Sequence, residues 1–308
     1  PAERDEIENG RTEKPVGRPY KRIINDVGPM GEAQRATLET LIQRSRAFRA
    51  ASPKERRTML LQGDPRVPIR VESDAANAGL DPRLFDMEAA DEETSKVNRA
   101  VRNLLSIYNS DKRATQVVFM EMGFSDTSTK SGGRDSEGNK LPSKKVARFN
   151  LAKDIVAKLV DGGVPRDEIA IVDGGTSKEK RREIADKMNA SKIRIVIGNT
   201  DTLGVGVNMQ VNLRAMHHLD APWMPGELEQ RNGRGHRQGN KWNTVLEYRY
   251  ITEKLDGRRW QVLMVKDRFI KAFLKADDSV RVIEGDAVST DEADADIAAT
   301  LSEAAGDP

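Results

Sequence analysis

The chain has 308 residues, enough for about two domains or for one domain with long extensions. Its 51 Lys and Arg nearly balance 49 Asp and Glu, so the net charge of +2 does not by itself indicate a nucleic-acid partner. The absence of cysteine excludes disulfides and cysteine-based zinc sites, and the three histidines lack the spacing of metal ligands. No apolar run approaches the roughly 20 residues of a membrane span, so we expect neither a metal nor a membrane partner.

The first part of the chain is predicted to hold helices and no parallel strand. Residues 1–30 are charged and rich in Pro and Gly, which is typical of an extended arm. Residues 31–114 form a predicted helical N-terminal extension, with helices over 32–51, after the cap Ser52-Pro53, over 71–79, and after a cap within 91–95. The acidic tetrad at 91–94 opens a helix rather than ending a strand. No G-x-x-x-x-G-K-[ST] phosphate loop occurs anywhere in the chain.

From residue 115 short apolar runs alternate with helical patterns. Strands are predicted near 117–120, 169–172, 193–197, 215–219 and 245–251, and helices near 151–161, 177–188 and 230–237. This alternation predicts an α/β fold over residues 115–252, a parallel sheet with helices on both faces. The alternating strand 245–251 is expected nearer an edge, and the polar stretch 125–145 is expected to be a loop.

The C-terminal end divides into a helix and an acidic segment. Residues 253–284 are predicted to contain one amphipathic helix over 256–274, and residues 285–308 an acidic disordered tail. Without that tail the remaining body is basic, which suits a phosphate backbone. Trp223, which lies between two prolines, is expected to pack a loop onto the sheet.

Two polar stretches follow neighbouring predicted strands. The run ending at Ile197 leads into Gly198-Asn199-Thr200-Asp201 and a glycine-rich turn, and such turns let a backbone approach a phosphate closely. Farther along, Arg234 and Arg237 are three residues apart, so on a helical turn they point the same way and favour a polyphosphate. Glycine turns and arginine-rich surface turns also occur without any such role.

The two stretches resemble known motifs. TDTLGVGVN resembles motif V of superfamily 2 helicases and translocases, and QRNGRGHRQGN resembles their motif VI. GRGHRQGN is similar to the Snf-type branch of double-stranded DNA translocases. The longer phrase HHLDAPWMPGELEQRNGRGHRQGN is similar to the helicase part of phage and plasmid methyltransferase–helicase proteins. DGGTSKEKR resembles the family's D-G-x-T-[ST]-x-x-[KER]-R segment.

The resemblance covers about residues 80–275 and implies the second RecA-like lobe of an ATP-driven motor. ATP and Mg²⁺ would be bound mainly by a first lobe that this chain does not contain. The implied partners are that first lobe, double-stranded DNA, and an attached or associated DNA methyltransferase. The implied location is the cytoplasm of a bacterial or phage-infected cell.

The resemblance also assigns residues to the nucleotide. Arg234 and Arg237 would be arginine fingers that face the γ-phosphate, and Gln230 would help to position them. The residues expected at the nucleotide cleft are Gly204, Gly206 and Asp201, the last of which would couple the cleft to the DNA.

A second set of residues is assigned to DNA. Thr200 and Thr202, through their hydroxyls, and the turn of Gly174, Gly175 and Thr176, through its backbone N–H groups, would hold DNA phosphates. Such contacts position a strand without reading its sequence. Thr176 or Ser177 also has a purely structural interpretation as the N-terminal cap of the helix that follows the turn.

Two functions remain open from the sequence. The chain is either one half of a DNA-dependent ATPase, or a helicase-like module that binds DNA or protein without hydrolysing ATP. The intact pair Arg234 and Arg237 favours the ATPase, because a module without catalysis has no physical need for paired arginines. An upstream segment that carries a phosphate-loop lysine and an Asp-Glu pair at the end of a strand would decide between them.

Overall fold

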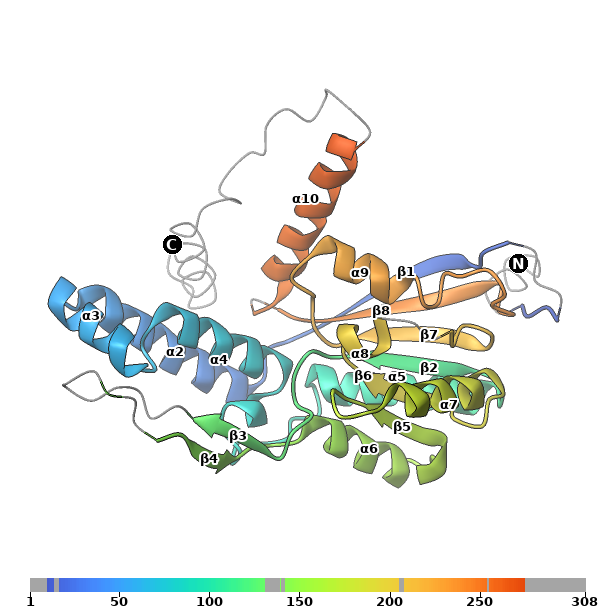
Figure 1. Cartoon of the computed structure of the whole chain (residues 1–308), viewed down its shortest axis with the longest axis horizontal. Helices are drawn as coiled ribbons and strands as arrows, with labels where there is room; N and C mark the ends of the chain where they lie inside the picture. Colours follow the sequence, from blue (N-terminus) through green and yellow to red (C-terminus); the bar gives the residue numbers. More distant parts are fainter. Residues whose placement is uncertain are drawn as a thin grey trace.

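The computed structural model describes residues 10–13, 17–130, 139, 142–204, 208–253 and 255–274. Its centre is a six-stranded sheet of order β1-β8-β7-β2-β6-β5 in which every neighbouring pair is parallel (Figure 1). The strands are β1 Tyr20–Gly28, β2 Thr115–Phe119, β5 Ile169–Val172, β6 Ile195–Gly198, β7 Leu213–His218 and β8 Thr244–Thr252. The central strands β2, β6 and β7 are buried along their whole length, as expected for short apolar strands covered on both faces.

Helices cover both faces of the sheet. Helices α5 Lys96–Ser110 and α6 Leu151–Asp161 pack on one face, where Leu104 and Ile155 share a core with Ile195. Helix α7 Lys178–Asn189 packs on the other face, where Met188 meets Val196. The predicted α/β fold with a parallel, RecA-like sheet is therefore confirmed.

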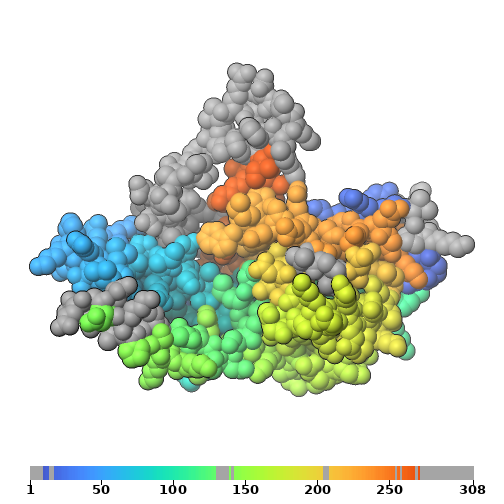
Figure 2. All heavy atoms as spheres, in the orientation of Figure 1, coloured from blue at the N-terminus to red at the C-terminus, as the bar shows by residue number. Residues whose placement is uncertain are grey.

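The predicted helical extension is also present, and it projects to one side of the sheet (Figures 1 and 2). It contains α2 Glu32–Ala50, α3 Pro53–Gln62, α4 Pro68–Leu80 and the 3₁₀ turn η1 Pro82–Leu84. Leu41 and Val71 lie in its own small core. The hydroxyl of Ser52 accepts a hydrogen bond from the backbone of Glu55, so the predicted cap begins α3 as expected.

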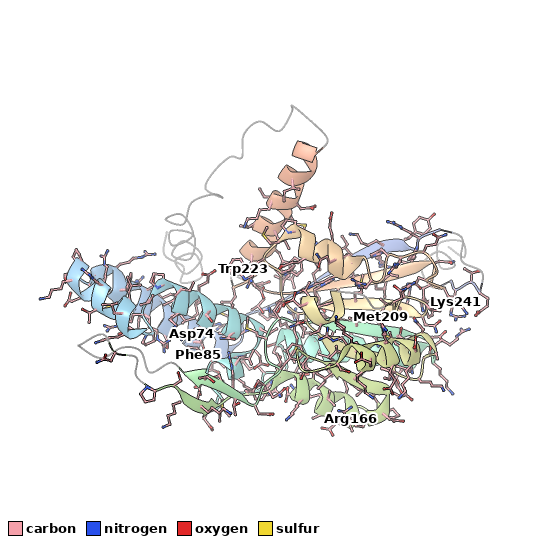
Figure 3. The ribbon with its side chains drawn as sticks, in the orientation of Figure 1. Asp74, Phe85, Arg166, Met209, Trp223 and Lys241 are labelled. Atoms are coloured by element: carbon pink, nitrogen blue, oxygen red, sulfur yellow. The ribbon has the colours of Figure 1, made fainter. Side chains whose placement is uncertain are left out.

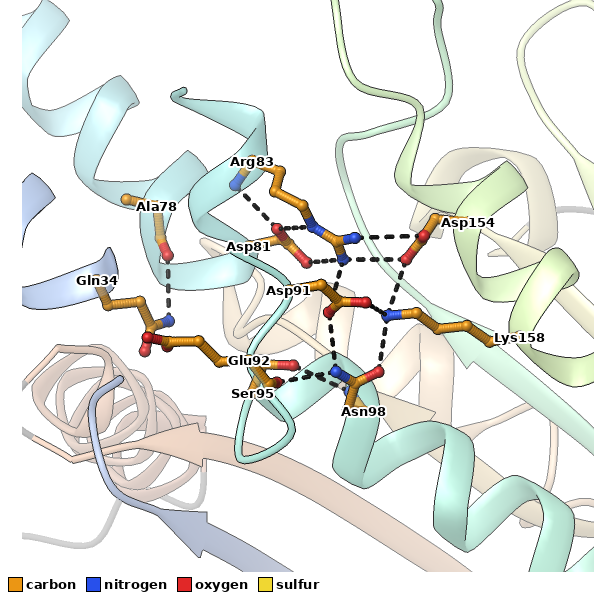
Figure 4. Close-up of polar contacts among 10 residues, drawn as sticks. All are labelled: Gln34, Ala78, Asp81, Arg83, Asp91, Glu92, Ser95, Asn98, Asp154 and Lys158. Atoms are coloured by element: carbon orange, nitrogen blue, oxygen red, sulfur yellow. Dashed lines mark hydrogen bonds and ion pairs between the residues drawn. The ribbon is translucent and has the colours of Figure 1, made fainter. Parts of the chain in front are cut away.

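A buried charge network joins this extension to α6 (Figure 4). The guanidinium of Arg83 lies 2.8 Å from Asp81, 3.0 Å from Asp154 and 3.3 Å from Asp91. Lys158 of α6 completes the network, 2.6 Å from Asp91. Removing one member would leave buried charge without a partner, so the network holds the extension in one position. Asp91 is part of this junction and follows no strand.

The N-terminal residues differ from the prediction of an extended arm. Residues 20–28 form the edge strand β1, whose register with β8 runs from Tyr20↔Thr244 to Gly28↔Thr252. Most β1 side chains are exposed, so the segment lacks the apolar pattern of a buried strand and is not recognisable as one. As a consequence β8 lies between β1 and β7, so it is near an edge as predicted but does not itself form the edge.

Two other segments complete the chain. The stretch predicted as a loop over 125–145 contains an antiparallel hairpin of β3 Thr127–Lys130 and β4 Lys144–Ala147, and residues 131–138 and 140–141 lie outside the described residues. Helix α10 Gly257–Leu274 occupies the predicted helical region and extends away from the sheet beside α9 (Figure 1). The acidic tail 285–308 lies outside the described residues. Within the described parts, no helix is long and apolar enough to cross a membrane.

Candidate functional site

The glycine-rich motif begins where β6 ends. Short helix α8 Thr200–Gly204 follows directly, and the side chain of Asn199 accepts a hydrogen bond of 2.8 Å from the backbone of Thr202. A Cβ on Gly198 would lie 2.8 Å from the carbonyl oxygen of Val172 on β5, so only glycine allows the two strand ends to approach this closely. The motif thus starts from a tightly fixed backbone.

Arg231, in helix α9 Pro225–Asn232, is the centre of a buried network at the same edge of the sheet. Its side chain has no exposed surface. Its Nε donates to the Thr200 hydroxyl at 2.8 Å, and Nη1 donates to the backbone oxygen of Asp220 at 3.0 Å. Nη2 donates to carboxylate oxygens of Glu121 at 2.5 Å and Asp220 at 3.1 Å. These contacts tie the ends of β2, β6 and β7 to α9.

The Arg231 network is charged. Burial raises the pKa of Glu121. Hydrogen bonds from Thr200 and the charge of Arg231 lower it by more than burial raises it, so the net shift is downward. Glu121 is therefore an ionised carboxylate facing a buried guanidinium. Arg231 needs its carboxylate partners, because without them it would be a buried, uncompensated charge.

Both threonine hydroxyls predicted to contact DNA are used inside the protein. Thr200 and Thr202 are 4% and 3% exposed. The Thr200 hydroxyl donates to Glu121 and accepts from Arg231, and that of Thr202 donates to the carbonyl of Val172 at 2.9 Å. In this structure the hydroxyls hold the turn itself and do not face a DNA phosphate. The reasons are local. The Thr202 hydroxyl accepts from the backbone of Asn199, whose side chain caps α8 in return. The Thr200 hydroxyl belongs to the Arg231 network.

The predicted arginine fingers lie in the turns that follow α9. The helix ends at Asn232, so Arg234 and Arg237 stand on turns rather than on the expected helix. Gln230 and Arg237 are exposed, and Arg234 is half-buried. The guanidinium of Arg237 donates to the side chain of Asn208, at the far end of the glycine-rich motif. The two motifs therefore touch.

Arg234 and Arg237 are also close to each other. Burial, and after it the charge of Arg237, lowers the pKa of Arg234 below its ordinary value. Two guanidiniums that repel one another at a partly exposed surface form a site that an anion would stabilise.

Two of the other residues assigned to the nucleotide lie on α8. Asp201 is exposed on α8, and Gly204 is the last residue of that helix. Gly206 lies outside the described residues. Their roles at a nucleotide cleft stay predictions.

The turn after β5 presents its backbone to solvent. Gly174 and Gly175 are exposed, and a Cβ built on Gly174 would meet nothing within 4 Å. Asp173 closes the turn from inside, because its carboxylate accepts from the Gly175 backbone at 3.0 Å and from the Thr176 hydroxyl at 3.0 Å. The hydroxyl of Ser177, and not that of Thr176, caps α7 by accepting from Lys180.

Sequence reasoning missed two arginines. Arg231 received no site role, although it is fully buried at the centre of the network. Arg181, the last residue of DGGTSKEKR, received no role, yet its guanidinium donates to backbone carbonyls of the turns after β5 and β6. The pattern did contain Arg181, but no sequence signal reveals which way its side chain points.

Trp223 also differs from the prediction. Trp223, labelled in Figure 3, is 58% exposed. The guanidinium of Arg259 from α10 lies 4.5 Å from its ring centroid. The buried tryptophan beside this loop is Trp260, which packs with Ala221 and Leu228. Trp260 therefore has the packing role that was expected of Trp223.

The histidines of β7 belong to the core. His217 lies between Tyr250 and Gln116, with its ring nitrogens 2.8 Å and 3.0 Å from their oxygens. Burial lowers the pKa of His217 to about 3, so its ring is neutral at physiological pH. Among the described residues, no group of His, Asp and Glu has the arrangement of a metal site.

Comparison with known proteins agrees with this arrangement. Residues 143–239 match the helicase conserved C-terminal domain. This range includes the turns at 173–176 and 198–204 and the arginine-rich block, residues 230–237. The chain is also 26% identical over 145 residues to defense against restriction protein B of Escherichia phage P1. That match covers 44% of this chain and only 6% of the phage protein.

Solved structures share the fold. The C-terminal part of the Fun30 ATPase domain superposes with a TM-score of 0.53 at 13% identity, covering 94% of this chain and all of that one. The Sulfolobus solfataricus SWI2/SNF2 ATPase core in complex with double-stranded DNA gives 0.51 at 15% identity, covering 84% of this chain and 47% of that one. Residues 143–239 are thus similar to the helicase conserved C-terminal domain, and the chain has a RecA-like fold.

Proposed function

We propose that this chain is the second lobe of an ATP-dependent helicase or translocase that acts on double-stranded DNA. The observation that carries the proposal is the pair Arg234 and Arg237, two neighbouring cations on a partly exposed surface beside the glycine-rich motif. A polyphosphate held by another lobe is the ligand that this pair fits best.

The proposed chemistry follows from that placement. Arg237 is exposed and reaches outward, so it meets a γ-phosphate when a first lobe closes against this face. Charge spreads over the phosphate oxygens as the bond to ATP breaks, and a guanidinium placed there stabilises it. Arg231 cannot act in this way, because Glu121 and Asp220 already neutralise it.

DNA is the proposed second ligand. The N–H groups of Gly175 and Thr176 already donate to Asp173, but Gly174 is exposed, and an outward N–H group at that position suits a phosphate oxygen. Binding through phosphates predicts weak, salt-dependent affinity with little sequence preference.

ATP and Mg²⁺ belong mainly to the first lobe in this proposal. The sequence has no G-x-x-x-x-G-K-[ST] loop, so it offers no residue for the phosphate-loop lysine. We therefore expect the chain alone to hydrolyse no ATP above background.

The test is a steady-state ATPase assay, with and without double-stranded DNA, on this chain alone and on the protein that also carries its first lobe. We expect turnover, stimulated by DNA, only in the two-lobed protein. DNA-stimulated turnover by this chain alone would contradict the proposal. A two-lobed protein that binds DNA without turnover would support an inactive binding module instead.

We further infer a DNA methyltransferase, attached or associated, as a partner in the cytoplasm of a bacterial or phage-infected cell. Support for the methyltransferase comes from the HHLDAPWMPGELEQRNGRGHRQGN phrase. The similarity to a phage P1 protein supports the phage-infected cell. Methyl transfer from a labelled donor to DNA by the full natural protein tests this inference, and its absence would contradict it.

A further inference from the structure

Arg181 joins two turns that are far apart in the sequence. It lies near the start of α7, and its half-buried side chain reaches back toward the beginning of that helix. Nε donates to the carbonyl of Thr176 at 3.0 Å, and Nη2 donates to that of Asp173 at 3.4 Å. Nη1 donates to the carbonyl of Thr202, in α8, at 3.5 Å. One planar guanidinium therefore spans the ends of β5 and β6.

These contacts set the direction of the neighbouring N–H groups. In a planar trans peptide the N–H points opposite to the carbonyl of the preceding residue. Because the carbonyls of Asp173 and Thr176 point to Arg181, the N–H groups of Gly174 and Ser177 point away from it. Both of these residues are exposed. The turn thus presents two outward donors whose orientation depends on the guanidinium.

We propose that Arg181 is a positioning residue for DNA: it fixes the turns after β5 and β6 so that outward N–H groups of the first turn meet a DNA phosphate. This inference rests on the proposed function, because it deepens the DNA contact assigned there. Lysine cannot replace arginine in this role, since a single ammonium does not present a planar fork to carbonyls on two separate turns.

A direct contact between Arg181 and a phosphate is the rival explanation, and the two differ in their response to lysine. If charge were what matters, Arg181→Lys would keep the affinity. If position matters, Arg181→Lys and Arg181→Ala both weaken binding. Arg182, the exposed neighbour on the same helix, gives a matched control with the same change of side chain.

The experiment measures binding of a fluorescent DNA duplex to the chain over a series of salt concentrations. We expect Arg181→Lys and Arg181→Ala to weaken binding about tenfold or more, the effect of losing hydrogen bonds to a charged group. We expect the slope of log affinity against log salt to stay unchanged, because no phosphate-neutralising charge is lost. Arg182→Lys should bind like the unchanged chain.

A second variant covers the case in which Arg181→Lys impairs folding. Gly174→Pro removes one outward N–H directly, and the side chain has open space there. It should lose a similar affinity with Arg181 intact, and combining it with Arg181→Lys should cost little more, because both changes remove the same contact.

Three results would overturn the inference. Wild-type affinity in Arg181→Lys, together with a slope lower by about 0.9 in Arg181→Ala, would show a direct phosphate contact. Wild-type affinity in both Arg181 variants and in Gly174→Pro would show that the turn does not bind DNA. If the unchanged chain binds no duplex even at low salt, the proposed DNA function fails together with this inference.

Discussion

The two ends of the arginine-rich block place the same side chain in opposite surroundings. Arg231 is completely buried and bonded to Thr200, Asp220 and Glu121. Arg237, six positions later, is exposed and donates to the neutral side chain of Asn208. One motif therefore contains an arginine that holds the fold and an arginine that is available to a ligand.

Electrostatics explains why the two roles separate. A guanidinium in the interior is stable only with carboxylates beside it, and Glu121 and Asp220 end the strands that surround Arg231. At the surface, water solvates Arg237, so keeping its charge unneutralised costs little. An incoming phosphate can then form an ion pair with the guanidinium of Arg237.

The largest effect should come from Arg237. In the two-lobed protein we expect Arg237→Ala to lower ATP turnover by about 10³–10⁵, the usual value of an arginine finger. This corresponds to roughly 4–7 kcal/mol of barrier at about 1.4 kcal/mol per decade. Folding and DNA affinity should change little, because the side chain is exposed and acts mainly in the transition state.

Steady-state ATPase measurements check this prediction, with the melting temperature as the folding control. Arg237→Lys should lose nearly as much activity, because an ammonium does not present the planar fork of a guanidinium. Arg182→Ala, an exposed arginine outside the block, is the matched control and should remain active. If Arg237→Ala keeps more than about a tenth of the turnover, the finger assignment is wrong.

The next largest effect concerns Arg231 and stability. Because Arg231 is fully buried, we expect Arg231→Ala to destabilise the fold. The change leaves Glu121 and Asp220 without their cation, which typically costs about 3–5 kcal/mol of unfolding free energy. Denaturant unfolding of the chain itself measures this, without ATP or a first lobe.

Glu121→Gln provides the partner experiment for Arg231. Combined with Arg231→Met it removes both charges, so the double variant should be more stable than the sum of the single changes predicts. Strict additivity would mean that the two side chains do not interact as the structure shows.

The comparison also shows what the sequence could reveal. The strands β2, β5 and β6 were predictable because they are short runs rich in β-branched residues. The edge strand β1 was not, because its exposed side chains lack that pattern. Spacing located the arginine-rich block correctly. It could not separate Arg231 from Arg237, since Glu121 and Asp220, the partners of Arg231, come from distant strand ends.

Acid should destabilise the buried core of the sheet, where His217 lies. His217 has a folded pKa of about 3 against an ordinary value of 6.5, because burial disfavours its charged form. The stability from keeping it neutral is therefore complete above about pH 6.5 and is lost as the pH falls toward 3. The slope is at most about 1.4 kcal/mol per pH unit for each such histidine.

Melting temperatures recorded from pH 7.5 to 4.5 test this effect. His217→Gln should flatten the decline, because it removes one titrating group, whereas Arg182→Ala should leave the slope unchanged. A melting temperature that is constant between pH 6.5 and 4.5 would contradict the assignment of neutral, buried histidines.

The smallest effect concerns the hydroxyl of Thr202, which lies in the buried turn after β6 and not in the open turn after β5. The Thr202 hydroxyl donates to Val172 and accepts from the backbone of Asn199, and the residue is 3% exposed. Thr202→Val keeps the shape and removes both bonds, so we expect a loss of about 1 kcal/mol of stability. DNA affinity and its salt dependence should stay as in the unchanged chain, in contrast to Gly174→Pro. A Thr202→Val variant that melts normally but binds DNA more weakly would restore the hydroxyl contact expected from the sequence. It would also show that α8 moves when DNA binds, because only a rearranged turn could expose that hydroxyl.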